Sequence, residues 1–254
     1  MKCSQYQLLI ILTAALMAAC SPAYVPNKVN TGLFTEPGEM HGELATGVSG
    51  TDIQVAAAIP GNLVVTANAS FKNRDLNTTV WADDDGSELV NVETNRKHRI
   101  FEVGAGYYQT WEDGLTLEAI AGYGRGTLEN VETDLIGPIL FGSQNSPTTF
   151  ITESTFNKIY IQPTIGLSKR FVDLGFTPKI AFVRININDQ QFSDTYFEPT
   201  VTLRAGPEKV KFTGQLGLSI PSGETIQYSY EPFIFSVGIM ADINVLKLGK
   251  SGEN

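Results

Sequence analysis

Apolar and polar residues alternate with a period of two along most of this chain, from Glu39 to about residue 246. Because successive side chains of a β-strand point to opposite faces, this period predicts strands. No stretch between residues 39 and 254 has an apolar period of 3.6 over a helical length, so the sequence predicts an all-β fold. In the clearest segment, 157–171, the apolar face consists of Ile159, Ile161, Pro163, Ile165 and Leu167.

Ten segments carry the alternation, and their lengths suit tilted strands that cross a bilayer, for which about 9–11 residues are needed. They are roughly 39–48, 51–59, 63–72, 98–110, 115–128, 155–171, 176–189, 195–205, 209–219 and 232–246. The sequence therefore predicts a single antiparallel up-and-down transmembrane β-barrel of about ten strands. Eight or twelve strands would result if the first hairpin or the long links are misread.

The links between these segments alternate in length. Short turns are expected at 60–62, 112–114, 172–175 and 206–208, and longer links at 73–97, 129–154, 190–194 and 220–231, with the tight turn 49–50 as the exception. Short turns on one rim and long loops on the other are typical of outer-membrane barrels. This asymmetry favours a membrane barrel, with its apolar face outward, over a soluble barrel.

Charged residues on the polar faces of the predicted strands are nearly balanced in sign, with four acids and five bases. They are Glu102, Glu118, Lys158, Arg170, Arg184, Glu198, Arg204, Lys211 and Asp242. An unpaired buried charge is costly, so such a set predicts a lumen closed by ion pairs. Side chains largely fill barrels near this size, and we expect no wide pore.

The overall charge is strongly negative, with a net charge of -9 and an isoelectric point near 4.8. This charge would repel phosphate backbones and excludes nucleic acid as an expected partner. The excess negative charge falls in the predicted loops 73–97 and 129–154, so we expect an acidic outer rim.

The N-terminus reads as a lipoprotein signal peptide over residues 1–19. Lys2 precedes an apolar run from Leu8 to Ala19 that is too short to span a bilayer, which needs about 20 residues. The ending Leu16-Met17-Ala18-Ala19-Cys20 resembles the bacterial lipobox, in which the cysteine thiol receives a diacylglycerol. Cys20 is therefore the expected lipidation site and the first residue after cleavage.

Residues 20–38 are expected to form an extended, lipid-anchored linker, because the stretch holds three prolines. The barrel is expected over 39–246, followed by a tail at 247–254. Ten strands place both ends of the barrel on the short-turn, periplasmic rim. We therefore expect an outer-membrane protein whose N-terminus is lipidated on the periplasmic side.

The stretch that leads into the first strand resembles the opening of a group of small outer-membrane β-barrel lipoproteins of Bacteroidota. The matching residues are Tyr24-Val25-Pro26-Asn27, Asn30, Leu33-Phe34-Thr35 and Gly38-Glu39. The group is largely uncharacterised, so the resemblance implies location and fold but no activity, cofactor or catalytic residue.

Candidate chemistry is sparse, and we expect neither an enzyme nor a cofactor. His98 lies near the acidic run Asp83-Asp84-Asp85, but a strand-end histidine beside a solvated loop is the simpler interpretation. Asp83 and Asp85 are weak candidates for a Ca²⁺ site, because Trp81 stands where a calcium loop needs an acid. The apolar segment 135–141 in a long loop is a candidate contact for an envelope partner.

Three functions remain open from the sequence. The leading one is a structural or accessory role in the cell envelope. The second is a barrel that binds or transports a small ligand through its lumen. The third is a lipid-anchored periplasmic barrel of lipocalin type, which requires Ile159, Ile161, Ile165 and Leu167 to point inward.

Overall fold

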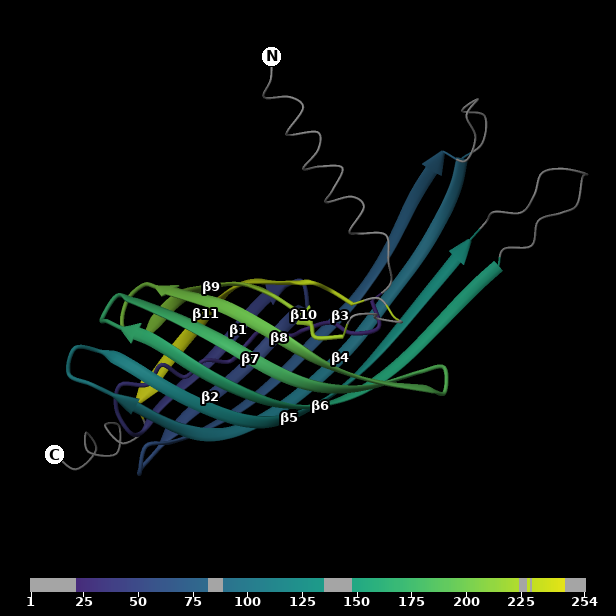
Figure 1. Cartoon of the computed structure of the whole chain (residues 1–254). Helices are drawn as coiled ribbons and strands as arrows, with labels where there is room; N and C mark the ends of the chain where they lie inside the picture. The colour runs from purple at the N-terminus through teal and green to yellow at the C-terminus, as the bar shows by residue number, and fades with distance from the viewer. Residues whose placement is uncertain (1–21, 82–88, 135–147, 224–227, 229, 245–254) are drawn as a thin grey trace, which may run out of the picture.

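A computed structural model describes residues 22–81, 89–134, 148–223, 228 and 230–244 (Figure 1). Among these residues no helix is long and apolar enough to cross a membrane. The predicted signal peptide, Cys20, the candidates Asp83 and Asp85, the segment 135–141 and the tail 247–254 lie outside the described residues.

The described fold is all-β, as predicted. Its strands are β1 (Glu39–Gly47), β2 (Gly50–Ile59), β3 (Leu63–Trp81), β4 (Leu89–Thr110), β5 (Leu115–Asp134), β6 (Thr148–Ser168), β7 (Val172–Ile187), β8 (Gln190–Ala205), β9 (Val210–Leu218), β10 (Ile220–Pro221) and β11 (Phe233–Asn244).

Ten of these strands form a closed antiparallel barrel, which confirms the predicted fold class. Each strand from β1 to β9 pairs with the next, β9 pairs with β11, and β11 closes the ring on β1. The closing register pairs Glu39 with Asn244 and Gly47 with Ser236. The two-residue β10 lies outside the ring and pairs only with β8. Closure leaves no free edge in the ring, so the backbone groups of the wall find their partners within it.

Four links predicted from the sequence differ in the structure: paired strand takes up all of 172–175 and 190–194, where β7 and β8 begin, and much of 73–97 and 129–154. β3 and β4 remain in register from Leu63↔Tyr107 as far as Trp81↔Leu89, and β5 and β6 remain paired as far as Asp134↔Thr148. Backbone pairing does not require alternating apolar side chains, so the ladder continues where the sequence signal ends. Figure 1 shows these two hairpins projecting well beyond one end of the barrel.

The two rims of the barrel therefore differ. We call one the long-hairpin rim, where β3–β4, β5–β6 and β7–β8 are joined and where residues 219–232 connect the last strands. The opposite, short-turn rim carries the connections 60–62, 111–114, 169–171 and 206–209. The ring begins and ends on the short-turn rim, where Glu39 of β1 pairs with Asn244 of β11.

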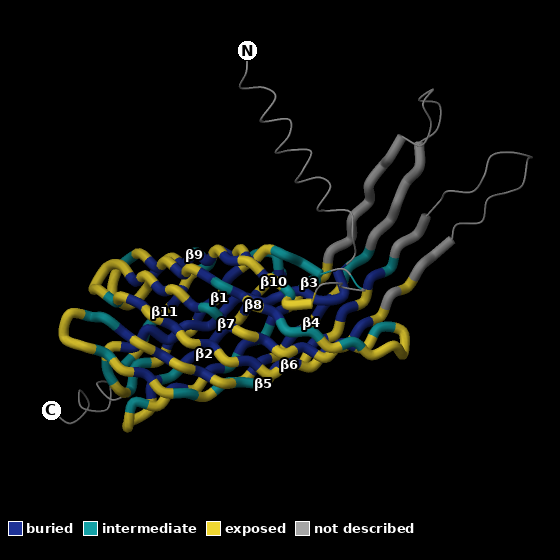
Figure 2. Tube along the Cα trace, in the orientation of Figure 1, coloured by how far each residue is buried: buried dark blue, intermediate teal, exposed yellow. Residues whose placement is uncertain are grey.

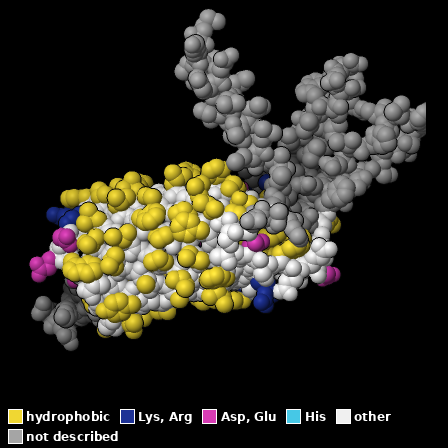
Figure 3. All heavy atoms as spheres, in the orientation of Figure 1, with side chains coloured by type: hydrophobic (Ala, Val, Ile, Leu, Met, Phe, Trp, Pro, Cys, Tyr) yellow, Lys and Arg dark blue, Asp and Glu magenta, His cyan; other side chains and the backbone are white. Residues whose placement is uncertain are grey.

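The inward and outward faces are assigned by exposure. Ile159 and Ile161 are 61% and 51% exposed, whereas Lys158 and Gln162 beside them are 1% and 3% exposed. Figure 2 shows this alternation of exposed and buried residues along the strands, and Figure 3 shows hydrophobic side chains covering the wall between the rims. Polar side chains face the lumen. Ile159, Ile161, Ile165 and Leu167 point outward, so the prediction of a lipocalin-type barrel, which requires them to point inward, is wrong.

The polarity reverses in β7 toward the long-hairpin rim. Ala181, Val183 and Ile185 point inward and are buried, and Arg184 between them is exposed on the outer face. Asn157 of β6 lies opposite Arg184 of β7 and Arg125 of β5 in the strand register. These outward polar residues border the exposed apolar side chains of the wall, which we call the apolar belt. The prediction that Arg184 faces the lumen is therefore wrong.

Candidate functional site

Residues 22–34 pass through the lumen, and we call them the plug segment. Every one of them is buried, a position inside the barrel that the sequence, which predicts an extended linker over 20–38, does not reveal. At the long-hairpin rim Asn130 donates to the carbonyl oxygen of Pro22 over 3.2 Å. At the short-turn rim Thr110 donates to the carbonyl oxygen of Phe34 over 2.6 Å. The segment thus runs from the long-hairpin rim to the short-turn rim before β1 begins.

Side chains from the barrel wall bind many of the peptide groups of the plug segment. An extended chain in the middle of a lumen has no neighbouring strand, and its buried N–H and C=O groups need other partners. Gln215 acts as a substitute strand: its Oε1 accepts from the Val29 N–H at 2.7 Å, and its Nε2 donates to the Val29 carbonyl at 2.9 Å. Gln54 and Gln162 donate to the carbonyls of Lys28 and Asn30.

Charged side chains serve the same purpose near the short-turn rim. Arg204 donates to the carbonyl oxygens of Thr31 at 2.5 Å and Gly32 at 3.3 Å. Glu118 accepts a hydrogen bond from the Gly32 N–H at 3.1 Å. These two predicted lumen charges therefore bind backbone groups of the plug segment and hold the segment in place.

The wall also makes room for the plug segment by omitting side chains. Gly166 and Gly175 pair across β6 and β7, and a Cβ on Gly166 would lie 2.3 Å from a methyl carbon of Leu33. Leu33 itself has a φ of 50°, which a branched residue adopts only when its surroundings hold it. The glycine pair is therefore a niche for Leu33.

Aromatic rings surround the plug segment toward the long-hairpin rim. The Tyr24 ring lies 5.3 Å from the Phe156 ring and 4.5 Å from the Tyr196 ring, measured between centroids. Its hydroxyl donates to Glu198 over 2.8 Å, so the buried phenol is satisfied. The backbone of Tyr24 also accepts from the Glu231 N–H at 2.9 Å. This collar holds the first part of the segment on the barrel axis.

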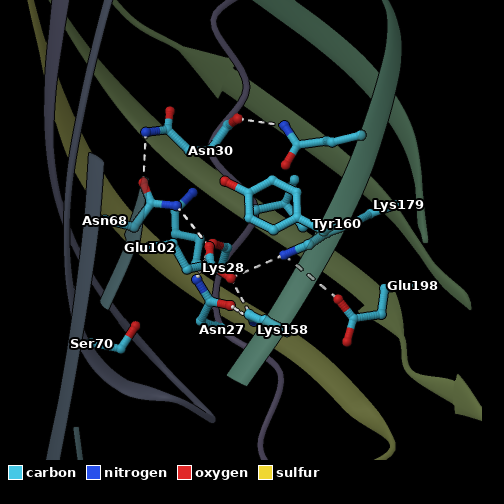
Figure 4. A network of polar contacts seen from close by, with 12 residues as sticks. Asn27, Lys28, Asn30, Asn68, Ser70, Glu102, Lys158, Tyr160, Lys179 and Glu198 are labelled. Atoms are coloured by element: carbon cyan, nitrogen blue, oxygen red, sulfur yellow. Dashed lines mark hydrogen bonds and ion pairs between the residues drawn. The ribbon is translucent and has the colours of Figure 1, made fainter. Parts of the chain in front are cut away.

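A four-charge cluster lies at mid-lumen (Figure 4). A carboxylate oxygen of Glu102 lies 2.5 Å from the Lys158 Nζ and 3.4 Å from the Lys179 Nζ. The Lys179 Nζ also lies 3.7 Å from a carboxylate oxygen of Glu198. Asn27 of the plug segment donates to Glu102 at 2.7 Å and accepts from Lys158 at 2.7 Å. Two carboxylates and two ammonium groups therefore neutralise one another, and the plug segment is part of the network.

The plug segment also contributes a charge of its own. Lys28 lies 2.9 Å from Glu43 of β1, and both side chains are buried. Thr213 donates to the same carboxylate from β9. This pair fixes the segment to β1, one of the two strands that close the barrel.

Most of the predicted lumen charges lie in the lumen. Six of them are buried there: Glu102, Glu118, Lys158, Glu198, Arg204 and Lys211. Asp242 is half-buried near the short-turn rim, 3.3 Å from His41. Arg170 instead lies exposed on that rim, 4.0 Å from Glu208, because its strand ends at Ser168. The prediction for Arg170, like that for Arg184, is wrong.

Among the residues whose burial the structure describes, sequence reasoning missed five buried charges. The sequence places Lys28 in the predicted linker and Asp173 in the predicted turn 172–175. It predicts Arg184 in the lumen, whereas Lys179 of the same strand faces inward, and an odd and an even residue of one strand cannot share a face. The missed set is Lys28, Glu43, Asp52, Asp173 and Lys179.

The described residues contain no group of three or more His, Cys, Asp and Glu side chains able to hold a metal ion. His41 stacks on Phe34 with the ring centroids 4.5 Å apart, and His98 is buried on the inward face. His41 thus has a packing role, and the acidic run Asp83-Asp84-Asp85 lies outside the described residues, so a contact between it and His98 stays untested.

The described residues of the connection between β9 and β11 contact the start of the plug segment. Tyr228 donates to Asp194 at 2.7 Å and shares a 2.8 Å hydrogen bond with Tyr196. Burial raises the pKa of the Tyr228 hydroxyl, and so do its hydrogen bonds to Asp194 and Tyr196. Burial likewise raises the pKa of Glu231, which neighbours the bridge between Tyr24 and Tyr230.

At the short-turn rim the barrel opens into a vestibule of about 860 Å³. Its lining carries both signs of charge and ends at Leu33 of the plug segment. Lys211 and Asp173 pair there at 2.8 Å. A ligand in the vestibule would meet the plug segment rather than an open path to the other rim.

A scan against protein-family models and a search of curated proteins found no match for this chain.

Proposed function

We propose that this protein is an outer-membrane β-barrel lipoprotein with a structural or accessory role in the cell envelope. The observation that carries the proposal is the orientation of the wall, which presents large apolar side chains outward and charged side chains inward. Exposing so continuous an apolar belt to water is unfavourable for a monomer, whereas the hydrocarbon core of a bilayer would cover it. The lipobox before Cys20 supplies an independent reason for an envelope location.

The filled lumen favours an accessory role over transport. The plug segment is held from rim to rim by side chains of several strands, so a solute crossing the barrel would have to displace it. The long hairpins β3–β4 and β5–β6 offer surface beyond the barrel for a protein partner. The segment 135–141, in the β5–β6 connection, is the partner contact that we propose.

Cysteine labelling in reconstituted vesicles tests the orientation of the wall. Ile161→Cys should react with a lipid-soluble maleimide and not with a charged one, because the side chain faces the belt. Gln162→Cys, its matched neighbour, should react with neither, since Gln162 is buried against Asn30. Reaction of Ile161→Cys with the charged reagent in vesicles would contradict a lipid-facing wall.

Two further experiments test the lipid anchor and the partner contact. The mass of the processed chain should correspond to Cys20 at the N-terminus carrying a diacylglycerol. Cys20→Ser should lose the lipid yet stay in the membrane after alkaline washing, because the belt holds it there.

Replacing 135–141 by Ser and Gly should remove co-purifying partners, and an unchanged set of partners would contradict the contact.

A further inference from the structure

The direction of the plug segment is given by three strands independently. Along β5, Asn130 binds Pro22 and Glu118 binds Gly32. Along β4, Glu102 binds Asn27 and Thr110 binds Phe34, and along β8, Glu198 binds Tyr24 and Arg204 binds Thr31. In all three strands the earlier plug residue meets the part of the strand nearer the long-hairpin rim. Pro22 therefore lies at the rim opposite the start of β1.

This direction restricts where a lipid on Cys20 can go. Cys20 precedes Pro22 by two residues, which extend over at most about 7 Å. The hydrocarbon core of a bilayer is about 30 Å thick. A lipid on Cys20 therefore cannot reach the leaflet beside the short-turn rim while the plug segment is in place. The expectation of a lipidated N-terminus on the periplasmic, short-turn side does not agree with this geometry.

We propose that the chain threads its own barrel, so that the acyl chains on Cys20 insert into the outer leaflet, on the side of the long hairpins. This inference rests on the proposed function, because it requires a lipidated membrane barrel. The short-turn rim is taken as periplasmic, which is the usual orientation of outer-membrane barrels.

Withdrawing the plug segment to reach the other leaflet would be unfavourable. Glu43 would lose its partner Lys28, and Glu102 would lose the amide of Asn27. Gln215 would lose both hydrogen bonds to Val29 in the same step. Buried polar groups left without partners are costly, so the threaded arrangement is the stable one.

Threading also constrains the order of assembly. Residues 22–34 occupy the lumen between the two rims, and a diacylated end cannot follow through a closed ring that they fill. The segment must therefore lie between the strands before β11 pairs with β1. β1, which takes part in this closure, carries Glu43, which binds Lys28, and β9, which pairs with β11, carries Gln215, which binds Val29.

Labelling of intact Gram-negative cells with a membrane-impermeant maleimide tests the inference. The reporter is Gly-Ser-Cys-Gly-Ser inserted after Ser21, and Ser21→Cys is a second reporter that leaves the chain length unchanged. Gln190→Cys marks the long-hairpin rim, and Glu208→Cys marks the short-turn rim; both positions are exposed. Both reporters and Gln190→Cys should label in intact cells, and Glu208→Cys only after permeabilisation.

The other outcomes separate the two proposals. If Gln190→Cys labels in intact cells and both reporters label only after permeabilisation, threading is wrong and the membrane barrel stands. If Glu208→Cys labels and Gln190→Cys does not, the long hairpins face the periplasm and the outer-leaflet anchor is wrong. If Ile161→Cys is also shielded from lipid-soluble reagents, the membrane barrel itself is wrong.

Discussion

Glu102 shows at the level of one residue how the lumen tolerates charge. Its carboxylate, buried at mid-lumen, meets two lysines and the amides of Asn27 and Asn68. Replacing one member of a buried ion cluster leaves the others uncompensated, which costs about 3–5 kcal/mol. We expect Glu102→Gln to lower the free energy of unfolding by about this amount, measured by denaturant titration in lipid or detergent.

The matched control for Glu102→Gln is Lys97→Gln. Lys97 lies 3.8 Å from Glu129, and both side chains are about half exposed. Exposed ion pairs contribute about 0–1 kcal/mol, so this variant should unfold almost like the parent protein. Equal effects of the two substitutions would contradict a buried, mutually dependent cluster.

Gly126 permits the close approach of Phe156 to the wall. A Cβ on Gly126 would lie 2.3 Å from the Phe156 ring, which in turn packs on Tyr24 of the plug segment. We expect Gly126→Ala to displace this ring and to cost about 1–3 kcal/mol, as overpacking usually does. Gly214→Ala, where a Cβ would meet nothing within 4 Å, is the control in the same unfolding assay and should change little.

At the scale of elements, the plug segment depends on side chains that imitate a strand. Gln215→Leu removes both hydrogen bonds to Val29 and keeps a similar volume. We expect faster hydrogen exchange at residues 27–32, measured by mass spectrometry on the reconstituted protein, because local opening becomes easier. The exposed Gln109→Leu should leave exchange there unchanged. Uniformly faster exchange over the whole barrel would instead indicate global destabilisation.

The elements that could be predicted from sequence are those with a period. The ten strands alternate because one face meets a polar lumen and the other does not, and this difference is visible in Ile161 and Gln162. The plug segment has no such period, since its side chains are buried on all sides, and its prolines predict only an extended linker. The sequence therefore gives no sign that Lys28 pairs with Glu43 in the lumen.

The predicted site was incomplete for a related reason. A period of two separates the residues of a strand into two faces, but it does not say which face points inward. In the middle of β7 the inward residue Lys179 is polar, whereas nearer the long-hairpin rim the outward residue Arg184 is polar. Assigning every polar residue to the lumen is therefore wrong near that rim, and the inward face must be followed by residue number from the middle of the strand.

At the scale of the whole molecule, barrel and plug segment make one closed body, and this predicts its electrical behaviour. In planar lipid bilayers the parent protein should show no steady conductance, because residues 22–34 fill the path between the rims. Deleting 22–34 while keeping Cys20 and Ser21 leaves Glu102, Lys158, Lys179 and Glu198 able to pair with one another. The lumen is polar, so it should then fill with water and conduct ions.

The control for this deletion is Lys97→Gln, which leaves the plug segment intact and should remain silent. Resistance of the deleted variant to protease would establish that its barrel still closes before its conductance is interpreted. A parent protein that conducts as well as the deleted one would mean that the plug segment leaves the lumen in a bilayer. In that case the contacts of Gln215 and Arg204 with its backbone would not be what keeps the barrel shut.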